Sequence, residues 1–143
     1  MKNTFKHICF IAVIAFSFAA LFLAGCDNGT TSRGTSLNDT WVAGGGAAVV
    51  TINGSSGTIT QIGGGPARWQ DAVNKGLIRV GNQYFRNLRK TGDLTWTGQE
   101  LQIKRETSTN AAVDVEWFNT IITMSVDGQT IYTSSSGTTF TRR

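Results

Sequence analysis

Cys26 is the residue whose position most clearly indicates chemistry, because it ends a long apolar run near the start of the chain. Lys2 and Lys6 precede this run, residues 8–22 are almost wholly apolar, and small residues lead into the cysteine. A basic start, an apolar centre and a small-residue end form the pattern of a secretory signal peptide. The apolar stretch is shorter than the ~20 residues that a membrane-spanning helix needs. The sequence therefore predicts an exported protein.

The four residues Leu23-Ala24-Gly25-Cys26 resemble a bacterial lipobox. The resemblance implies that a diacylglyceryl group is joined to the Cys26 sulfur, that the chain is cut after Gly25, and that the new N-terminus is usually acylated. Several acyl chains hold a protein durably on a membrane, since each buried methylene contributes roughly 0.8 kcal/mol. We therefore expect a lipoprotein of the bacterial cell envelope, with its domain outside the cytoplasm, on either the inner or the outer membrane.

Cleavage after Gly25 would remove most of the reactive side chains. His7, the single histidine, and Cys9 lie before the cut, and Cys26 is acylated. The remaining 118 residues then offer no Ser-His-Asp triad, no Cys-His pair, no disulfide and no zinc site built from His or Cys. Their net charge falls from +4 to +2, which does not support nucleic-acid binding. We expect a non-enzymatic protein with no metal, cofactor or nucleic-acid partner.

Asp114 and Glu116 are the pair of acids whose spacing suggests hydrolytic chemistry. A glycosidase needs two carboxylates about 5 to 9 Å apart across a cleft, usually from separate elements. Positions i and i+2 of one strand share a face instead. Two carboxylates are also too few for a calcium site, which takes six or more oxygen ligands. Solubilising charges on an outward strand face are the favoured interpretation.

Four tryptophans in so small a domain raise the question of a ligand cavity. Trp96 and Trp117 lie in strand-like runs and Trp69 in a helix-like segment, so these three residues are candidates for lining such a cavity. Core packing is the alternative, because tryptophan supplies much of the buried area of a small core. Core packing is favoured for the two tryptophans in strands.

The elements that must position these residues are mainly short strands. Runs of β-branched and aromatic residues alternate with glycine-containing turns after residue 38. Turns are predicted at 53–56, 81–82, 98–99 and 127–128, and strands at 41–42, 48–52, 57–62, 77–80, 83–88, 93–97, 100–104, 113–117, 121–126, 129–133 and 139–142. Pro66, the apolar spacing of Trp69, Ala72 and Val73, and Gly76 predict one short helix over 66–75.

Apolar and polar residues alternate along these strands, as in Leu94 and Trp96 against Thr95 and Thr97. Such alternation is typical of antiparallel sheet, and the short linkers leave no room for helical crossovers. A meander of this length has to close or stack to hide its edge strands. The predicted fold is therefore all-β, an antiparallel meander closing into a barrel of about eight to ten strands with one short helix. A β-sandwich is the alternative.

Asn38-Asp39-Thr40-Trp41 at the first strand, and Thr139-Phe140-Thr141-Arg142 at the last, resemble the lipocalin-like (calycin) barrels of small bacterial lipoproteins, the spirochaetal type especially. In lipocalins a tryptophan of the first strand lies at the closed end of the barrel, and an arginine from near the last strand crosses its ring. The resemblance implies that Trp41 and Arg142 form this structural pair. It also implies an interior that can hold a small apolar ligand.

These observations divide the chain into a signal peptide (1–25), a lipidated flexible tether (26–37) and a lipocalin-like β-barrel domain (38–143). We expect a membrane-anchored lipoprotein that binds a small apolar ligand or acts as an interaction module for an envelope protein. The alternative is a structural or antigenic surface lipoprotein with a filled barrel and no ligand. In either case the lipid bilayer is a partner through acylated Cys26.

Overall fold

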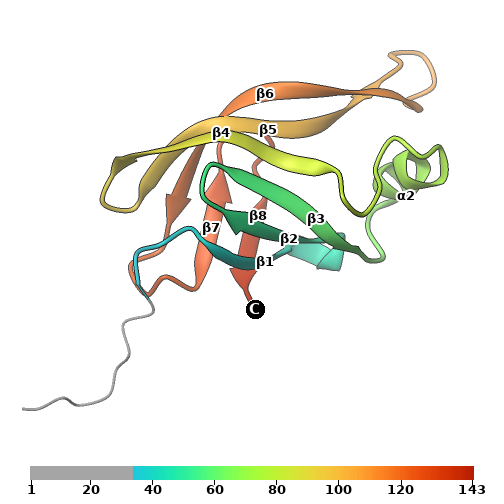
Figure 1. Cartoon of the computed structure of the whole chain (residues 1–143). Coiled ribbons are helices and arrows are strands. Elements are labelled where there is room, and N and C mark those ends of the chain that lie inside the picture. Colours follow the sequence, from blue (N-terminus) through green and yellow to red (C-terminus); the bar gives the residue numbers. More distant parts are fainter. Residues whose placement is uncertain (1–33) are drawn as a thin grey trace, which may run out of the picture. The chain divides into compact units, whose positions relative to one another are not determined.

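The computed structural model describes residues 34–143, so the predicted signal peptide, Cys26 and most of the predicted tether lie outside the described residues. A short 3₁₀ turn, η1 (Gly44–Gly46), and one helix, α2 (Ala67–Asn74), accompany a closed antiparallel barrel (Figure 1). Its eight strands are β1 (Asp39–Ala43), β2 (Ala48–Asn53), β3 (Ser56–Ile62), β4 (Gln83–Gly92), β5 (Thr95–Arg105), β6 (Ala112–Met124), β7 (Thr130–Thr133) and β8 (Thr139–Arg142). Within residues 34–143, no helix is long and apolar enough to cross a membrane.

Each strand pairs with the next one in the chain, and β8 returns to pair with β1. In this closing pair Trp41 lies opposite Arg142, and Ala43 lies opposite Phe140. Closure pairs both edge strands and so leaves no open sheet edge. The predicted all-β meander that closes into a barrel with one helix is confirmed, and the β-sandwich alternative is wrong.

Three details of the predicted strand pattern are wrong. The turn predicted at 98–99 lies in the middle of β5, and the chain reverses at 93–94 instead. The strands predicted at 113–117 and 121–126 are parts of the single strand β6. The strand predicted at 77–80 is irregular, because the N–H groups of Leu77 and Ile78 donate back to the Ala72 carbonyl of α2.

Gly98 permits a close approach between strands rather than a turn. A Cβ atom at this position would lie 2.7 Å from the Leu88 Cδ2 atom and 2.9 Å from the Arg86 carbonyl oxygen of β4. The β4–β5 register shifts between Arg86 and Arg89, and Asn87 takes a φ of 55° within this bulge. The bulged part of β4 therefore packs directly against the backbone of β5, which only glycine allows.

Helix α2 is fastened to the first residue of β6 by polar contacts. The Asp71 carboxylate accepts a hydrogen bond of 2.7 Å from the Ala112 N–H, and the Lys75 ammonium donates one of 2.9 Å to the Ala112 carbonyl. The hydrogen bond from Ala112 also lowers the pKa of Asp71. Trp69 and Ala72 form the buried face of the helix. Figure 1 shows α2 beneath the far ends of β5 and β6, which extend beyond the other strands.

Side chains fill the centre of the barrel. The largest apolar ones with almost no exposed surface are Trp41, Val50, Ile52, Ile59, Ile78, Phe85, Ile122, Ile131 and Phe140. The rings of Phe85 and Phe140 lie 5.7 Å apart in a tilted arrangement, which is favourable for aromatic pairs. An eight-stranded barrel is narrow enough to be filled in this way. The central section is therefore a packed core rather than an open cup.

Trp41 and Arg142 lie together at the end of the barrel where the chain enters β1. The guanidinium carbon lies 4.8 Å from the centroid of the Trp41 ring. Arg142 donates a hydrogen bond of 2.8 Å to the Ser36 carbonyl, and its Nε atom lies 3.4 Å from the Asp39 carboxylate. The Trp41 indole donates to the Leu37 carbonyl at 2.9 Å. Both side chains are buried, so they close this end and hold the segment before β1 in place.

Replacing Arg142 with methionine should lower the free energy of unfolding by about 2 kcal/mol. The variant loses the cation over the Trp41 ring, worth ~0.5 to 2 kcal/mol, and leaves the Ser36 carbonyl without its donor. Urea unfolding followed by tryptophan fluorescence measures the change. Arg143→Met is the matched control, because Arg143 is exposed, and it should change stability by less than about 0.5 kcal/mol. Equal effects of the two substitutions would contradict the role assigned to Arg142.

Candidate functional site

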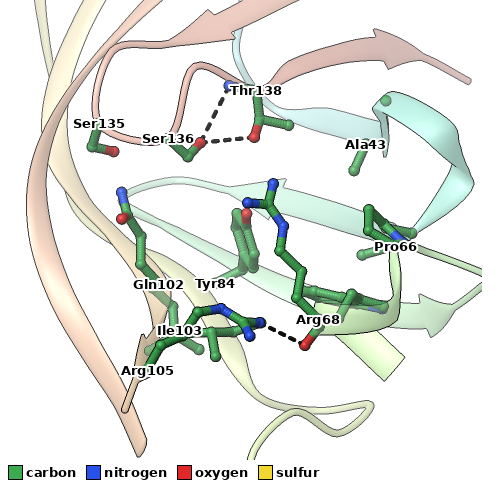
Figure 2. A pocket seen from close by; sticks show the side chains of 15 residues that line it. Ala43, Pro66, Arg68, Tyr84, Gln102, Ile103, Arg105, Ser135, Ser136 and Thr138 are labelled. Carbon is green, nitrogen blue, oxygen red and sulfur yellow. Dashed lines mark hydrogen bonds between the residues drawn. The ribbon is translucent and has the colours of Figure 1, made fainter. Parts of the chain in front are cut away.

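A cavity of about 300 Å³ lies at the other end of β1 and β8, away from Arg142. Its wall comes from several elements: the end of β1 with η1, the start of β2, helix α2, Tyr84 of β4, the last part of β5 and the loop at 134–138 (Figure 2). Two further hollows, of about 700 and 520 Å³, open broadly to solvent. The first cavity is less open to solvent than the other two and has a mixed lining, so it is the candidate site.

Trp69 lies in this wall with an unsatisfied hydrogen-bond donor. It enters from the first turn of α2 and is 9% exposed, yet its indole Nε1 has no hydrogen-bond partner. Its ring lies directly over Gly65, where a Cβ atom would come within 2.7 Å of Trp69 Cδ1 and 2.9 Å of the Ala47 Cβ. The glycine before the helix therefore sets how deeply the indole reaches into the cavity.

Gln102 and two arginines supply the polar groups nearest the opening. Figure 2 shows the Gln102 side chain running from β5 toward Ser135, and its Nε2 atom is buried without a partner. Arg105 donates a hydrogen bond of 2.9 Å to the backbone carbonyl of Arg68. The Arg68 side chain is exposed and reaches across the cavity toward the loop at 134–138 (Figure 2). This end of the site thus combines the exposed cation of Arg68 with a buried amide of Gln102 that has no partner.

Glu100 lies directly behind the cavity wall and has no exposed surface. Its carboxylate accepts hydrogen bonds from hydroxyl groups alone among the contacts in residues 34–143. These come from Tyr84 at 3.1 Å, Thr133 at 3.3 Å, Ser136 at 2.8 Å, and Ser135. Burying a carboxylate costs several kcal/mol unless its oxygens are satisfied. The hydroxyl groups satisfy it here without a cation.

The contacts of Glu100 also order the loop at 134–138. Ser136 Oγ lies 2.8 Å from the hydroxyl groups of both Thr133 and Thr138, and it accepts from the Thr138 N–H at 3.3 Å. The Ser135 N–H donates to the Thr120 hydroxyl at 3.4 Å. Ser135 and Ser136, which line the cavity, are therefore fixed by their hydrogen bonds to the buried Glu100 carboxylate. Figure 2 shows the contacts between Ser136 and Thr138.

Tyr84 connects this acid to the cavity. Burial raises the pKa of Tyr84 well above 10, and the nearby charge of Glu100 and its hydrogen bond act in the same direction. The phenol is therefore held neutral with its proton directed at Glu100. Its ring packs edge-on against Phe85 at 4.9 Å between centroids, which fixes its position on β4.

The candidate residues named from the sequence lie in different parts of the structure. It brings Trp41 and Arg142 together, and it places Trp69 in the cavity wall. Trp96 lies in a separate hollow near Lys90, and Trp117 lies under the guanidinium of Arg86, at 4.0 Å. Neither of these two lines the cavity, because both sit on stretches of β5 and β6 that face elsewhere. Cys26 lies outside the described residues.

Four residues of the site were missed by sequence reasoning, namely Tyr84, Glu100, Gln102 and Ser135. The turn predicted at 98–99 made Glu100 the first residue of the predicted strand 100–104, on the polar face with Gln102 and Lys104. In a continuous strand Glu100 lies on the same face as Trp96, because side chains alternate along a strand and Glu100 is four positions from Trp96. The run of three serines at 134–136 is the other signal, since hydroxyl groups there meet a buried acid.

Asp114 and Glu116 do not form a catalytic pair across a cleft. Glu116 makes an ion pair of 2.5 Å with Lys104 on the neighbouring strand, and this hydrogen bond raises the pKa of Lys104. Asp114 is exposed. Among residues 34–143, no group of three or more His, Cys, Asp or Glu side chains is arranged to hold a metal ion. The cavity wall therefore offers hydrogen-bonding groups and apolar surface.

No protein-family model, curated protein or solved structure matches this chain.

Raising the pH should destabilise the protein from about pH 10 upward through Tyr84. The folded pKa lies above the ordinary value of about 10, so the folded state keeps a proton that the unfolded state loses. The stability contributed by this group is complete below pH 10 and is lost as the pH rises toward the folded pKa. The urea concentration at the midpoint of unfolding should fall between pH 8 and pH 11, and it should fall less in Tyr84→Phe than in the parent protein.

Absorbance at 295 nm provides an independent measurement of the same ionisation. In a Tyr132→Phe background Tyr84 is the only tyrosine, because the chain has two. Phenolate absorbance should then rise together with unfolding, followed by circular dichroism. A rise that is complete while the protein is still folded would contradict the burial of the neutral phenol.

Proposed function

We propose that this protein is a lipid-anchored envelope protein whose barrel binds a small ligand in the cavity beside α2. The observation that carries the proposal is the cavity itself, of about 300 Å³, whose wall joins aliphatic side chains with the Trp69 ring and the polar residues Tyr84 and Ser135. A concave site of this composition can bury the apolar body of a small ligand and offer it a few hydrogen bonds.

The rest of the lining supports a ligand with an apolar body. Ala47, Ala48, Leu101 and Ile103 contribute aliphatic surface, and Trp69 contributes the face of its ring. The cavity volume of about 300 Å³ is at the lower end of the range for small-molecule sites. Apolar walls with a few fixed polar groups are the usual composition of such sites. The ligand is therefore small, with one polar end.

A second function is supported by the packing of the barrel centre. Trp41, Phe85, Phe140 and the surrounding isoleucines leave the middle section filled. A structural or antigenic surface protein requires a stable barrel and no cavity. The end cavity favours binding over this alternative, because a purely structural barrel needs no hollow lined by both apolar and polar groups.

The anchoring part of the proposal rests on the sequence pattern that ends at Cys26. An acylated Cys26 would leave the residues before β1 as a short tether between the bilayer and the barrel. The bilayer is then the permanent partner, and the ligand or another envelope component is the exchangeable one. Nucleic acid is not a proposed partner, and no enzymatic reaction is proposed.

A ligand should accompany the protein when it is extracted from its own bacterium in a mild detergent and examined by native mass spectrometry. Trp69→Leu removes the aromatic ring that lines the cavity, so ligand affinity should fall roughly five- to tenfold. Trp96→Leu is the matched control, because Trp96 lies outside the cavity and its replacement should leave occupancy unchanged. Protein that is free of ligand, or equal effects of the two variants, would favour the structural alternative.

Replacing Cys26 with serine should abolish labelling of the protein by radioactive palmitate. The variant has no thiol to receive the diacylglyceryl group, so its precursor should remain uncleaved by the lipoprotein signal peptidase. Metabolic labelling followed by electrophoresis measures both effects. Cys9→Ser is the control, since Cys9 belongs to the predicted signal peptide, and it should leave labelling intact. Continued labelling of Cys26→Ser would refute the anchor.

A further inference from the structure

We propose that the outer face of β4, β5 and β6 binds a carboxylated polysaccharide, in the hollow of about 700 Å³ that opens broadly to solvent there. This is a second binding site, because its lining shares no residue with the cavity beside α2. In Figure 1 the three strands form the uppermost wall of the barrel, and no other helix or strand of residues 34–143 is drawn above them.

The strand pattern places the lining of the hollow on the outside of the barrel. On β5 Thr97 and Gln99 line it, and the next residue, Glu100, is buried on the other side of the sheet. On β6 the exposed Asn119 and Ile121 line it, opposite Gln99 and Thr97 in the register. Side chains two positions apart on a strand share a face, so these four lie together on the outer one.

Three side chains from neighbouring strands form a hydrogen-bond chain across this face. Arg86 of β4 donates from Nε to Gln99 Oε1 at 2.7 Å, and Gln99 Nε2 donates to Asn119 Oδ1 at 3.2 Å. An arginine can only donate, so the Gln99 oxygen must face it, and the Asn119 oxygen must then face the Gln99 nitrogen. The chain therefore ends on Asn119 Nδ2, a donor on an exposed side chain with no partner among the described residues.

Two arginines make this face cationic. Arg86 lies opposite Gln99 and Arg89 lies opposite Thr97, two positions of β5 that are about 7 Å apart. Arg89 is exposed and lines the hollow. The Arg86 guanidinium is held by Gln99 and by the Trp117 ring, whose centroid is 4.0 Å away. Neither arginine forms an ion pair within residues 34–143, so both can bind an anion.

No acidic side chain balances this charge in the hollow, because its lining contains neither Asp nor Glu. The three acids of β4, β5 and β6 are occupied or lie elsewhere. Glu100 is buried, and Glu116 forms its ion pair with Lys104. Asp114 is five positions from Asn119, so the alternation of side chains puts it on the opposite face. The hollow therefore favours an anionic ligand.

The neutral side chains of the hollow favour a sugar chain as the carrier of that charge. Guanidinium groups bind carboxylates through paired hydrogen bonds, and amides and hydroxyl groups such as those of Asn119 and Thr97 can bind sugar hydroxyl groups. Ile121 is 48% exposed and offers apolar contact to the C–H face of a sugar ring. A lipid surface is recognised mainly by charge, which would leave these neutral groups without a role. The open hollow lets a polymer lie across it.

Polygalacturonate is the probe for this proposal, and the same polymer with its carboxyl groups methyl-esterified is the neutral comparison. Binding to the full chain in a non-ionic detergent is measured by isothermal titration calorimetry. The affinity for polygalacturonate, per binding site, should be at least about tenfold higher than that for the ester. It should also fall when the salt concentration rises from about 0.05 M to about 0.5 M, because ions screen exposed charges.

Asn119→Asp is the sharpest variant, because it keeps the oxygen that accepts from Gln99 and replaces only the free Nδ2 donor with an anionic oxygen. Its affinity for polygalacturonate should fall at least about tenfold, and that of Arg89→Gln should fall similarly. Arg143→Gln is the matched control, since it removes an exposed arginine outside the hollow, and it should change the affinity less than about twofold. Circular dichroism checks that each variant is folded.

Equal binding of the two polymers, no binding of either, or an unchanged affinity in Asn119→Asp would overturn the proposal. Tighter binding to polyglutamate or to phosphatidylglycerol vesicles would overturn it as well, because the face would then recognise an acidic peptide or a lipid surface. Trp69→Leu alters the cavity beside α2 and should leave polygalacturonate binding unchanged. The two sites are therefore tested separately.

Discussion

The pairing of β1 with β8 is the interaction on which the rest of the structure depends. It joins the two ends of the meander, so that every strand has two neighbours and no sheet edge is left open. Closure also gives the barrel two ends that need covering. At one end Trp41 and Arg142 pack on each other under the segment before β1. At the other end α2, η1 and the loop at 134–138 form the cover, and the cavity lies beneath them.

The cavity end contains a buried charge that the centre of the barrel avoids. The centre of the barrel is apolar and closely packed, whereas Glu100 is a fully buried carboxylate. Its charge is tolerated because hydroxyl groups from β4, β7 and the loop at 134–138 converge on it. Tyr84 and Ser135, which donate to Glu100, lie in the same cavity wall as Trp69 and Gln102, whose buried donors have no partner. Local conflicts of this kind are typical of binding sites.

The sequence predicted the structure correctly where the relevant pattern lay within one short segment of the chain. Alternation along β5 and β6 and the turn at 127–128 are local patterns, and they led to the correct fold class. Gly98 is ambiguous locally, since glycine is typical both of turns and of close strand contacts. The role of Gly98 depends on Leu88 of β4, which packs directly against it. The position of Leu88 depends in turn on a bulge in β4 that no sequence pattern predicts. The misplaced turn put Glu100 at the start of a separate strand, on its polar face, and so gave no sign that this residue is buried.

By itself the sequence determined a domain without histidine, an all-β chain with one short helix, and the pairing of Trp41 with Arg142 at one end of the barrel. It also predicted an export signal that ends at Cys26. Only the tertiary structure decided that eight strands form the barrel, that its centre is filled, and that a cavity remains beside α2. The tertiary structure also decided which polar groups have hydrogen-bond partners. The physical reason is that a hydrogen-bond partner is a matter of distance in space, and the partners of Glu100 come from positions 16 to 36 residues away in the chain.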